Sequence, residues 1–228
     1  MKFRTLVGAV ASVALFASAA AAQVCQGDLS FRGRPMHVSG ALGITDNTTT
    51  FGGGLLVGHT QGWYGGGSLS LMNADGAAGS GFVLGGGVGY SMALQQRSRW
   101  QVCPGATLSL GFGPDVDLGG THVDVSTRTF TLGASIGTTT PLSKSVTLIP
   151  YGSLALANTN FKASSGGVSG STGDTYAMLG FGAGFQFSPT LVLRPSLSFN
   201  LDSDIMDETI FSLGVTFALP HGQTTRRK

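Results

Sequence analysis

The chain has 228 residues, of which only 11% are charged and 37 are glycine. About a quarter of the residues of an ordinary soluble domain are charged, so this composition disfavours that class of protein. The net charge is only +2, and nothing in its distribution indicates a nucleic-acid partner.

Residues 1–22 have the organisation of a secretory signal peptide. Lys2 and Arg4 are basic, residues 6–16 are apolar, and three alanines at 20–22 offer a cleavage site. The apolar stretch is too short for a membrane-spanning helix. We therefore expect export and a mature chain that begins at Gln23 and carries eleven basic and eleven acidic residues.

Residues 23–35 are expected to form a periplasmic N-terminal arm. This arm contains Cys25, and the other cysteine of the chain is Cys103. In an exported protein an even number of cysteines favours a disulfide. Two free, buried thiols are the alternative.

From residue 36 to residue 219 the sequence alternates with a period of two. Residues 179–187, for example, place Leu, Phe, Ala, Phe and Phe at odd positions and glycine at 180, 182 and 184. Successive side chains of a strand point to opposite faces, so one face is apolar and the other carries Gly, Ser and Thr. This pattern is typical of a transmembrane barrel, with apolar residues toward lipid and small polar residues toward the lumen.

The alternation predicts an all-β, antiparallel, up-and-down transmembrane β-barrel of about ten strands, with eight strands as the alternative. A basic C-terminal tail, 220–228, follows the barrel. The strands are expected near 37–45, 50–58, 62–72, 80–92, 99–112, 122–138, 145–160, 175–187, 190–201 and 208–219.

The charges predict how the barrel is oriented. If the N-terminus lies in the periplasm, connections after odd-numbered strands face the outside. Ten of the eleven acidic residues fall at that outer end and most basic residues at the inner end; Asp28, Arg128 and Lys162 are the exceptions. Under this topology a disulfide between Cys25 and Cys103 would pin the arm to the inner mouth of the barrel.

The predicted outer loops are acidic. Their carboxylates could bind Ca²⁺ or Mg²⁺, with simple solvation as the alternative, and neither Asp-x-Asp motif extends into a full calcium-loop pattern. No cofactor or defined metal site is predicted. The acidic residues in question are Asp115, Asp117, Asp202, Asp204 and Asp207.

The lumen is predicted to be narrow, with Arg194 and Asn200 pointing into it. Barrels near eight strands are filled by side chains, but the many lumen glycines leave room for a thin water path. His122, near the outer rim, could act with a nearby acid and Ser126 in nucleophilic catalysis. Solvated loop residues are the favoured interpretation, so we do not expect an enzyme.

The mature chain resembles the small outer-membrane β-barrel family of Gram-negative-type bacteria, with eight to ten strands. The resemblance rests on the signal peptide, the glycine-alternating strands such as 179–187, the Ile-Pro-Tyr-Gly opening at 149–152, and the terminal strand 210–217. This last strand looks like the signal that such barrels present to the barrel assembly machinery, although in that family the final aromatic is usually the last residue and here eleven residues follow Phe217.

The resemblance implies an outer-membrane location, contact with outer-membrane lipid, and a structural, surface-interaction or narrow-pore (porin-like) role. Two alternatives are a soluble periplasmic barrel that binds a small ligand, and a lipid-modifying enzyme of the outer membrane.

Overall fold

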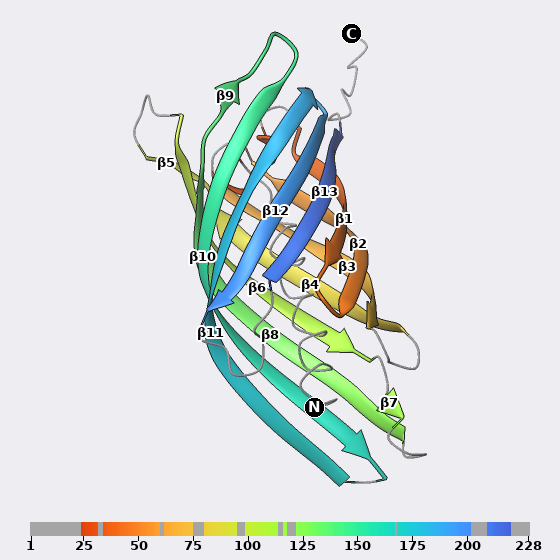
Figure 1. Ribbon diagram of the computed structural model, residues 1–228. Coiled ribbons are helices and arrows are strands. Elements are labelled where there is room, and N and C mark those ends of the chain that lie inside the picture. Colours follow the sequence, from red (N-terminus) through yellow and green to blue (C-terminus); the bar gives the residue numbers. More distant parts are fainter. Residues whose placement is uncertain are drawn as a thin grey trace, which may run out of the picture.

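The chain forms a closed antiparallel β-barrel (Figure 1). The computed structural model describes residues 24–31, 34–59, 62–74, 80–94, 99–113, 116–117, 122–166, 168–201 and 209–219.

Ten long strands make up the barrel wall within these described residues, which confirms the predicted fold class and strand number. They are β1 (Met36–Ile44), β2 (Thr48–Gly58), β3 (Trp63–Ala74), β4 (Ser80–Tyr90), β6 (Gln101–Phe112), β8 (His122–Gly137), β10 (Thr147–Ser165), β11 (Val168–Ser188), β12 (Leu191–Leu201) and β13 (Thr209–Leu219). Three two-residue strands lie beyond the wall: β5 (Met92–Ala93), β7 (Val116–Asp117) and β9 (Thr140–Pro141).

Each long strand pairs with its neighbours in sequence, and the first pairs with the last. In the closing ladder Met36 lies opposite Leu219 and Ile44 lies opposite Phe211. Because the ring is complete, the wall has no open edge along its common length, which is the arrangement required of a sheet in lipid.

The two faces of the wall differ as the alternation predicts. Large apolar side chains on the outer face are highly exposed, among them Phe51 (65%), Trp63 (71%) and Leu156 (60%). Small polar side chains such as Thr107 and Thr131 are buried inside. So much exposed apolar surface suits lipid rather than water.

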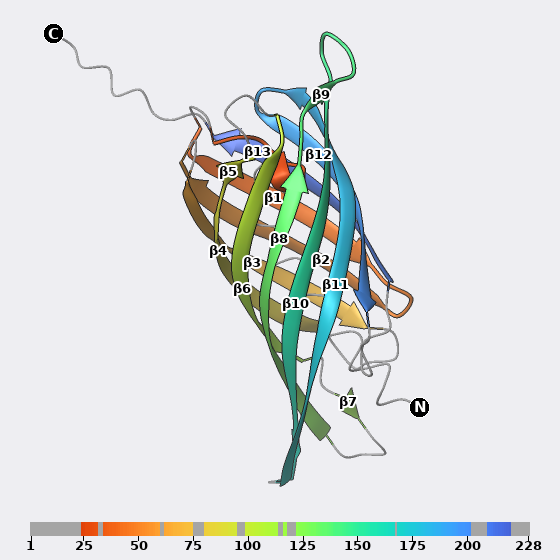
Figure 2. The ribbon, with the colours of Figure 1, turned by 90° about the vertical axis from the view of Figure 1, so that its left-hand side faces the viewer.

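Two strands are longer than the sequence predicts. Residues 162–174 were expected to form a loop, but β10 continues to Ser165 and β11 begins at Val168, and the two pair along all this length. β12 pairs with β11 only from Ala177 onward, so the β10–β11 hairpin projects past β12 and β13 (Figure 2). On its other side β10 stays paired with β8 as far as Ser164, which lies opposite Asp124. The projecting part contains mostly Ser, Gly and Thr and lacks an apolar face, which is why period-two hydrophobicity does not reveal it.

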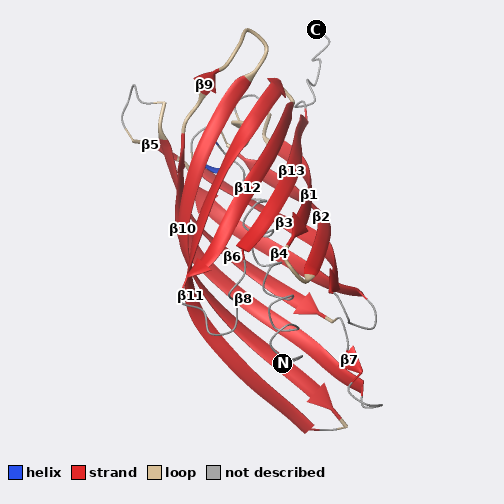
Figure 3. Cartoon of the chain, viewed as in Figure 1, coloured by secondary structure: helices blue, strands red, loops and turns tan. Residues whose placement is uncertain are grey.

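The N-terminal arm lies inside the barrel. Its short 3₁₀ helix η1 (Val24–Gln26) appears in Figure 3 as the blue segment enclosed by the red strands. This helix contacts β6, β8 and β10 near one mouth of the barrel. Among the described residues, no helix is long and apolar enough to cross a membrane.

Candidate functional site: the barrel lumen and its N-terminal arm

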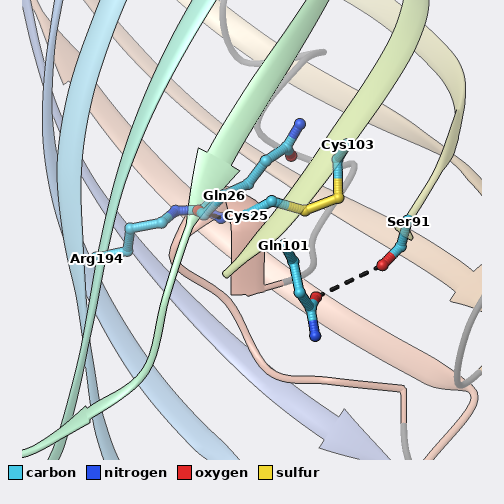
Figure 4. Close-up of a disulfide and its surroundings, with 6 residues drawn as sticks. All are labelled: Cys25, Gln26, Ser91, Gln101, Cys103 and Arg194. Atoms are coloured by element: carbon cyan, nitrogen blue, oxygen red, sulfur yellow. Dashed lines mark hydrogen bonds between the residues drawn. A yellow bond between two sulfur atoms is a disulfide. The ribbon is translucent and has the colours of Figure 1, made fainter. Parts of the chain in front are cut away.

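A disulfide joins the arm to the barrel wall, as the sequence predicts. Cys25 in η1 bonds to Cys103 at the start of β6, and their Cα atoms are 6.0 Å apart (Figure 4). The two cysteines are 0% and 1% exposed. The arm is therefore attached within the mouth of the barrel and not merely beside it.

Inward-facing glycines of the wall provide the space in which the arm is seated. A Cβ atom at Gly184 of β11 would overlap the carbonyl oxygen of Gly27, and one at Gly137 of β8 would overlap that of Val24. Gly58 of β2 makes room for the ring of Phe31 in the same way. Gly27 itself has a φ of 75°, a conformation that favours glycine, so the arm turns sharply where it meets the wall.

A buried ion pair fixes the arm on the side opposite the disulfide. The Arg194 guanidinium donates to Asp28 Oδ2 at 3.1 Å and to the backbone carbonyl of Gln26 at 3.2 Å. The Thr216 hydroxyl donates to the same Asp28 oxygen at 2.7 Å. Asp28 is completely buried, and its other oxygen accepts the Leu29 amide at 2.7 Å. Asp28, an exception to the predicted charge pattern, is thus the partner of a lumen arginine.

Apolar side chains of the arm pack against both sides of the mouth. One cluster joins Phe31 and Cys25 to Leu56, Tyr64 and Cys103. The Phe31 ring also stacks on His37, with 4.4 Å between ring centroids.

The second cluster lies on the other side of the arm. It joins Val24 and Leu29 to Ile149, Val192 and Ala218. With the arm in place, the mouth is packed like a small protein core.

Beyond the arm the lumen contains a cavity of about 120 Å³. Gln26 of the arm forms part of its wall, together with Tyr64, Ser135 and Arg194. The other inward-facing residues that line it are mainly small, either glycine or hydroxyl residues: Gly105, Gly133, Gly180, Gly214, Thr107, Thr131, Ser153, Ser196, Ser198 and Ser212.

Toward the opposite mouth, side chains fill the lumen. Met72, Phe161, Tyr176 and Ile210 are all buried there. Thr159 lies between the Thr129 hydroxyl (2.9 Å) and the Tyr176 hydroxyl (3.3 Å). The cavity is therefore bounded by the arm on one side and by this side-chain layer on the other.

The remaining predicted site residues are placed as follows. Asn200 has the inward parity of Arg194 on β12, and its Oδ1 is buried without a hydrogen-bond partner among the described residues. Asp115, Asp202, Asp204 and Asp207 lie outside the described residues, as do the side chains of Asp117 and His122. Within the described part of the chain, no three His, Cys, Asp or Glu side chains gather in a way that could hold a metal ion.

Sequence reasoning did not foresee that the arm enters the lumen. Two signals in the sequence are consistent with it in retrospect. The arm has apolar residues at Val24, Leu29 and Phe31, and it carries the one acidic residue that does not map to the outer end, Asp28.

Comparison with known proteins gives a family match over almost the whole chain. The model of the outer membrane protein beta-barrel domain matches residues 8–218. No curated protein matches the chain significantly.

Solved structures with a similar arrangement include Ail, the attachment invasion locus protein of Yersinia pestis, at 17% identity and a TM-score of 0.41, covering 80% of this chain and 93% of that one. The beta domain of the Bordetella autotransporter Brka is 15% identical with a TM-score of 0.49, and the match covers 81% of this chain and 98% of that domain. The N-terminal barrel of Pseudomonas aeruginosa OprF is 17% identical with a TM-score of 0.36, and the match covers 80% of this chain and 95% of that barrel.

The family match covers all ten barrel strands, and their outer face is apolar. The protein therefore belongs to the outer membrane protein beta-barrel domain family and is located in the outer membrane.

Proposed function

We propose that this protein is a closed, non-enzymatic outer-membrane barrel that displays its β10–β11 hairpin at the cell surface. The observation that carries the proposal is the contrast between the two ends of the barrel. One mouth is filled by the arm, which is held by a disulfide and a buried ion pair. From the other end the paired β10 and β11 project.

The closed lumen favours a structural or surface-interaction role over a constitutive pore. A conducting path needs continuous water, but the arm fills one mouth and buried Met72, Phe161 and Tyr176 fill the other half. The outer-membrane location removes the soluble periplasmic alternative. The enzyme alternative rested on His122, and no geometry of the described residues favours it.

The projecting hairpin is the part of the barrel best suited to surface contacts. Residues 168–176 of β11 lie beyond the pairing with β12, which corresponds to about 30 Å of strand. Outer loops of bacterial barrels are generally longer than periplasmic turns, which supports placing this end outside.

Three partners follow as parts of the proposal. Outer-membrane lipid would contact the apolar outer face, and the barrel assembly machinery would recognise β13, whose Phe217 is 49% exposed. Divalent cations would bind the acidic outer connections through carboxylate oxygens.

Epitope insertion in intact cells tests the orientation. One epitope is inserted at the 166–168 turn of the β10–β11 hairpin, and a matched epitope at Ser143–Ser145, in the turn at the opposite end of β10. We expect antibody to bind intact cells that carry the first insertion, and to bind the second only after permeabilisation. The reverse labelling would refute the proposed display.

Planar-bilayer recording tests closure. The disulfide-intact protein should leave the conductance at the level of lipid alone. Reproducible single-channel steps would instead favour the narrow-pore role, for which the 120 Å³ lumen cavity is the one supporting observation.

A further inference from the structure

Two basic residues depart from the predicted charge pattern, and the fold places them near each other on the outer face of the barrel. Arg128 of β8 lies opposite Asn160 of β10, and Lys162 is two residues farther along β10 on the same face. Such diagonal neighbours in a sheet are about 7–8 Å apart, within reach of long side chains. Both side chains are exposed, and each follows a buried, inward-facing residue, Thr127 or Phe161. One small group can therefore contact both cations of this basic pair.

The basic pair lies where the outer face changes from apolar to polar. On β8 the outward-facing Phe130 is 47% exposed, and on β10 Leu156 is 60% exposed. The next outward-facing residues of β10 are Asn158 and Asn160, and the Asn158 amide donates to the Thr175 hydroxyl of β11 at 2.8 Å. Charged side chains near the end of a membrane span extend toward the lipid headgroups. We therefore place the basic pair at headgroup level, next to the band of outward-facing apolar residues, the apolar belt.

The positive charge of the pair is not neutralised within the described residues. Neither Arg128 nor Lys162 forms an ion pair with a described carboxylate. Asp124 lies on the same face of β8, but it is opposite Ser164, farther from the apolar belt, and it makes no ion pair with Lys162. Two neighbouring like charges repel each other, and an anion between them replaces this repulsion by two attractions. The basic pair is therefore complementary to an anionic group at the membrane surface.

We propose that the basic pair binds the phosphate group of an outer-leaflet lipid whose acyl chains lie along the apolar belt. The Arg128 guanidinium offers a fork of donors that matches a phosphate, and the Lys162 ammonium adds a compact charge. Exposed Phe130 and Leu156 adjoin the pair and offer the apolar surface that acyl chains require, which favours a lipid over free phosphate. This inference rests on the proposed orientation, in which the hairpin end of the barrel faces outside.

The test is a titration of the mature, disulfide-bonded barrel in neutral detergent with lipid A, an acylated sugar lipid that carries phosphate groups. Native mass spectrometry measures the bound lipid. Dephosphorylated lipid A, which keeps the acyl chains, is the matched ligand. We expect the phosphorylated lipid to bind at least about tenfold more tightly, because hydrogen bonds between charged groups are lost with the phosphate. Inorganic phosphate should compete only weakly, because it cannot use the apolar belt. Equal affinity for the two lipids, or for lipid A and inorganic phosphate, would contradict the proposal.

Two double variants assign the binding to these residues. Arg128→Gln/Lys162→Gln removes both charges at exposed positions, and the apparent Kd for lipid A should rise at least about tenfold. Arg99→Gln/Lys144→Gln makes the same changes at exposed residues before β6 and β10, at the opposite end of the barrel, and should bind like the wild type. The mobility difference between boiled and unboiled samples shows that each variant is folded. If both double variants bind lipid A equally well, the basic pair is only solvated charge and the proposal is wrong.

The titration and the epitope experiment can fail separately. Protein in detergent has no orientation, so phosphate selectivity is measured without reference to the cell surface. Reversed epitope labelling would refute the display and the assignment to the outer leaflet, with the phosphate selectivity unchanged. Loss of that selectivity would refute the lipid site and leave the display of the hairpin unaffected.

Discussion

At the scale of single residues, Asp28 and Arg194 form a buried ion pair that attaches the arm to β12. Breaking a buried pair by removing one partner typically costs 3–5 kcal/mol, because the other charge stays buried. We predict that Asp28→Asn lowers the free energy of unfolding by about this amount. Urea unfolding of the refolded protein in lipid vesicles measures it.

A double variant controls for the charge itself. In Asp28→Leu/Arg194→Met both charges are replaced by apolar groups, which is often neutral or stabilising at buried sites. The double variant should therefore be more stable than Asp28→Asn. If the two variants lose equal stability, the packing of the arm and not its charge pair is what matters.

The wall glycines that make room for the arm, Gly58, Gly137 and Gly184, give a second residue-scale prediction. Because a Cβ at Gly184 would overlap the Gly27 carbonyl, Gly184→Ala should displace the arm and expose the disulfide. We expect the folded protein to be reduced by dithiothreitol at least about tenfold faster, since reduction requires opening of a buried site. Gly170→Ala, on the same strand but with no atom within 4 Å of the new Cβ, should leave the rate unchanged.

These residue-level features were only partly predictable. The disulfide follows from two cysteines in an exported chain, and the inward direction of Arg194 follows from strand parity. The glycines that make room for the arm could not be predicted in this way. In the sequence, Gly58, Gly137 and Gly184 look like any other small residue on the lumen face. Only the three-dimensional closeness of the arm distinguishes them from glycines that border open space.

At the scale of the strands, β11 shows where the membrane belt ends. Phe181 and Val168 are both exposed apolar residues of β11 (51% and 77%), but Phe181 lies within the wall, opposite Leu197 of β12, and Val168 lies on the projecting hairpin. An arginine near mid-membrane on the lipid face costs about 2–4 kcal/mol and much less outside it. Phe181→Arg should therefore destabilise the barrel by about that amount, and Val168→Arg hardly at all. Equal losses in vesicle-based unfolding would mean that the hairpin also contacts lipid.

The projecting hairpin itself should be dispensable for folding. Lys162 and Ser171 lie opposite each other, so residues 163–170 can be replaced by Asn-Gly, which forms a two-residue hairpin turn. We expect this shortened barrel to insert and to keep the mobility difference between boiled and unboiled samples on a gel. Loss of that difference would show that the hairpin guides assembly of the wall.

Predicted and observed strands agree inside the membrane belt and differ outside it. Inside the belt, alternating hydrophobicity locates all ten strands to within a few residues, because lipid and lumen impose opposite preferences on successive side chains. Outside it, residues 162–174 have no apolar face to alternate, and strand pairing rather than burial keeps them extended. Alternating hydrophobicity appears only where one strand face contacts lipid and the other faces the lumen. It therefore predicts β10 and β11 only within the membrane.

At the scale of the whole molecule, the chain is held together by the strand ladder of the wall and by the disulfide to the arm. We expect that the disulfide can be lost while the wall stays folded. The ten-strand ladder closes the wall through β1 and β13 without any help from the arm. The disulfide spans 78 positions and so ties the first half of the barrel to the arm. In the chain-entropy account a loop of this length contributes about 4 kcal/mol by restricting the unfolded chain.

The double variant Cys25→Ser/Cys103→Ser separates these systems. We expect it to unfold at lower urea concentration than the wild type, by up to that amount, and still to show the mobility difference of a folded barrel. The wall has its own hydrogen bonds, and Asp28 keeps its contacts with Arg194 and Thr216, so neither depends on the bond. Wild-type protein under reducing conditions should match the variant. If the variant instead loses the mobility difference altogether, the arm is an integral part of barrel closure, and the wall does not fold as an independent unit.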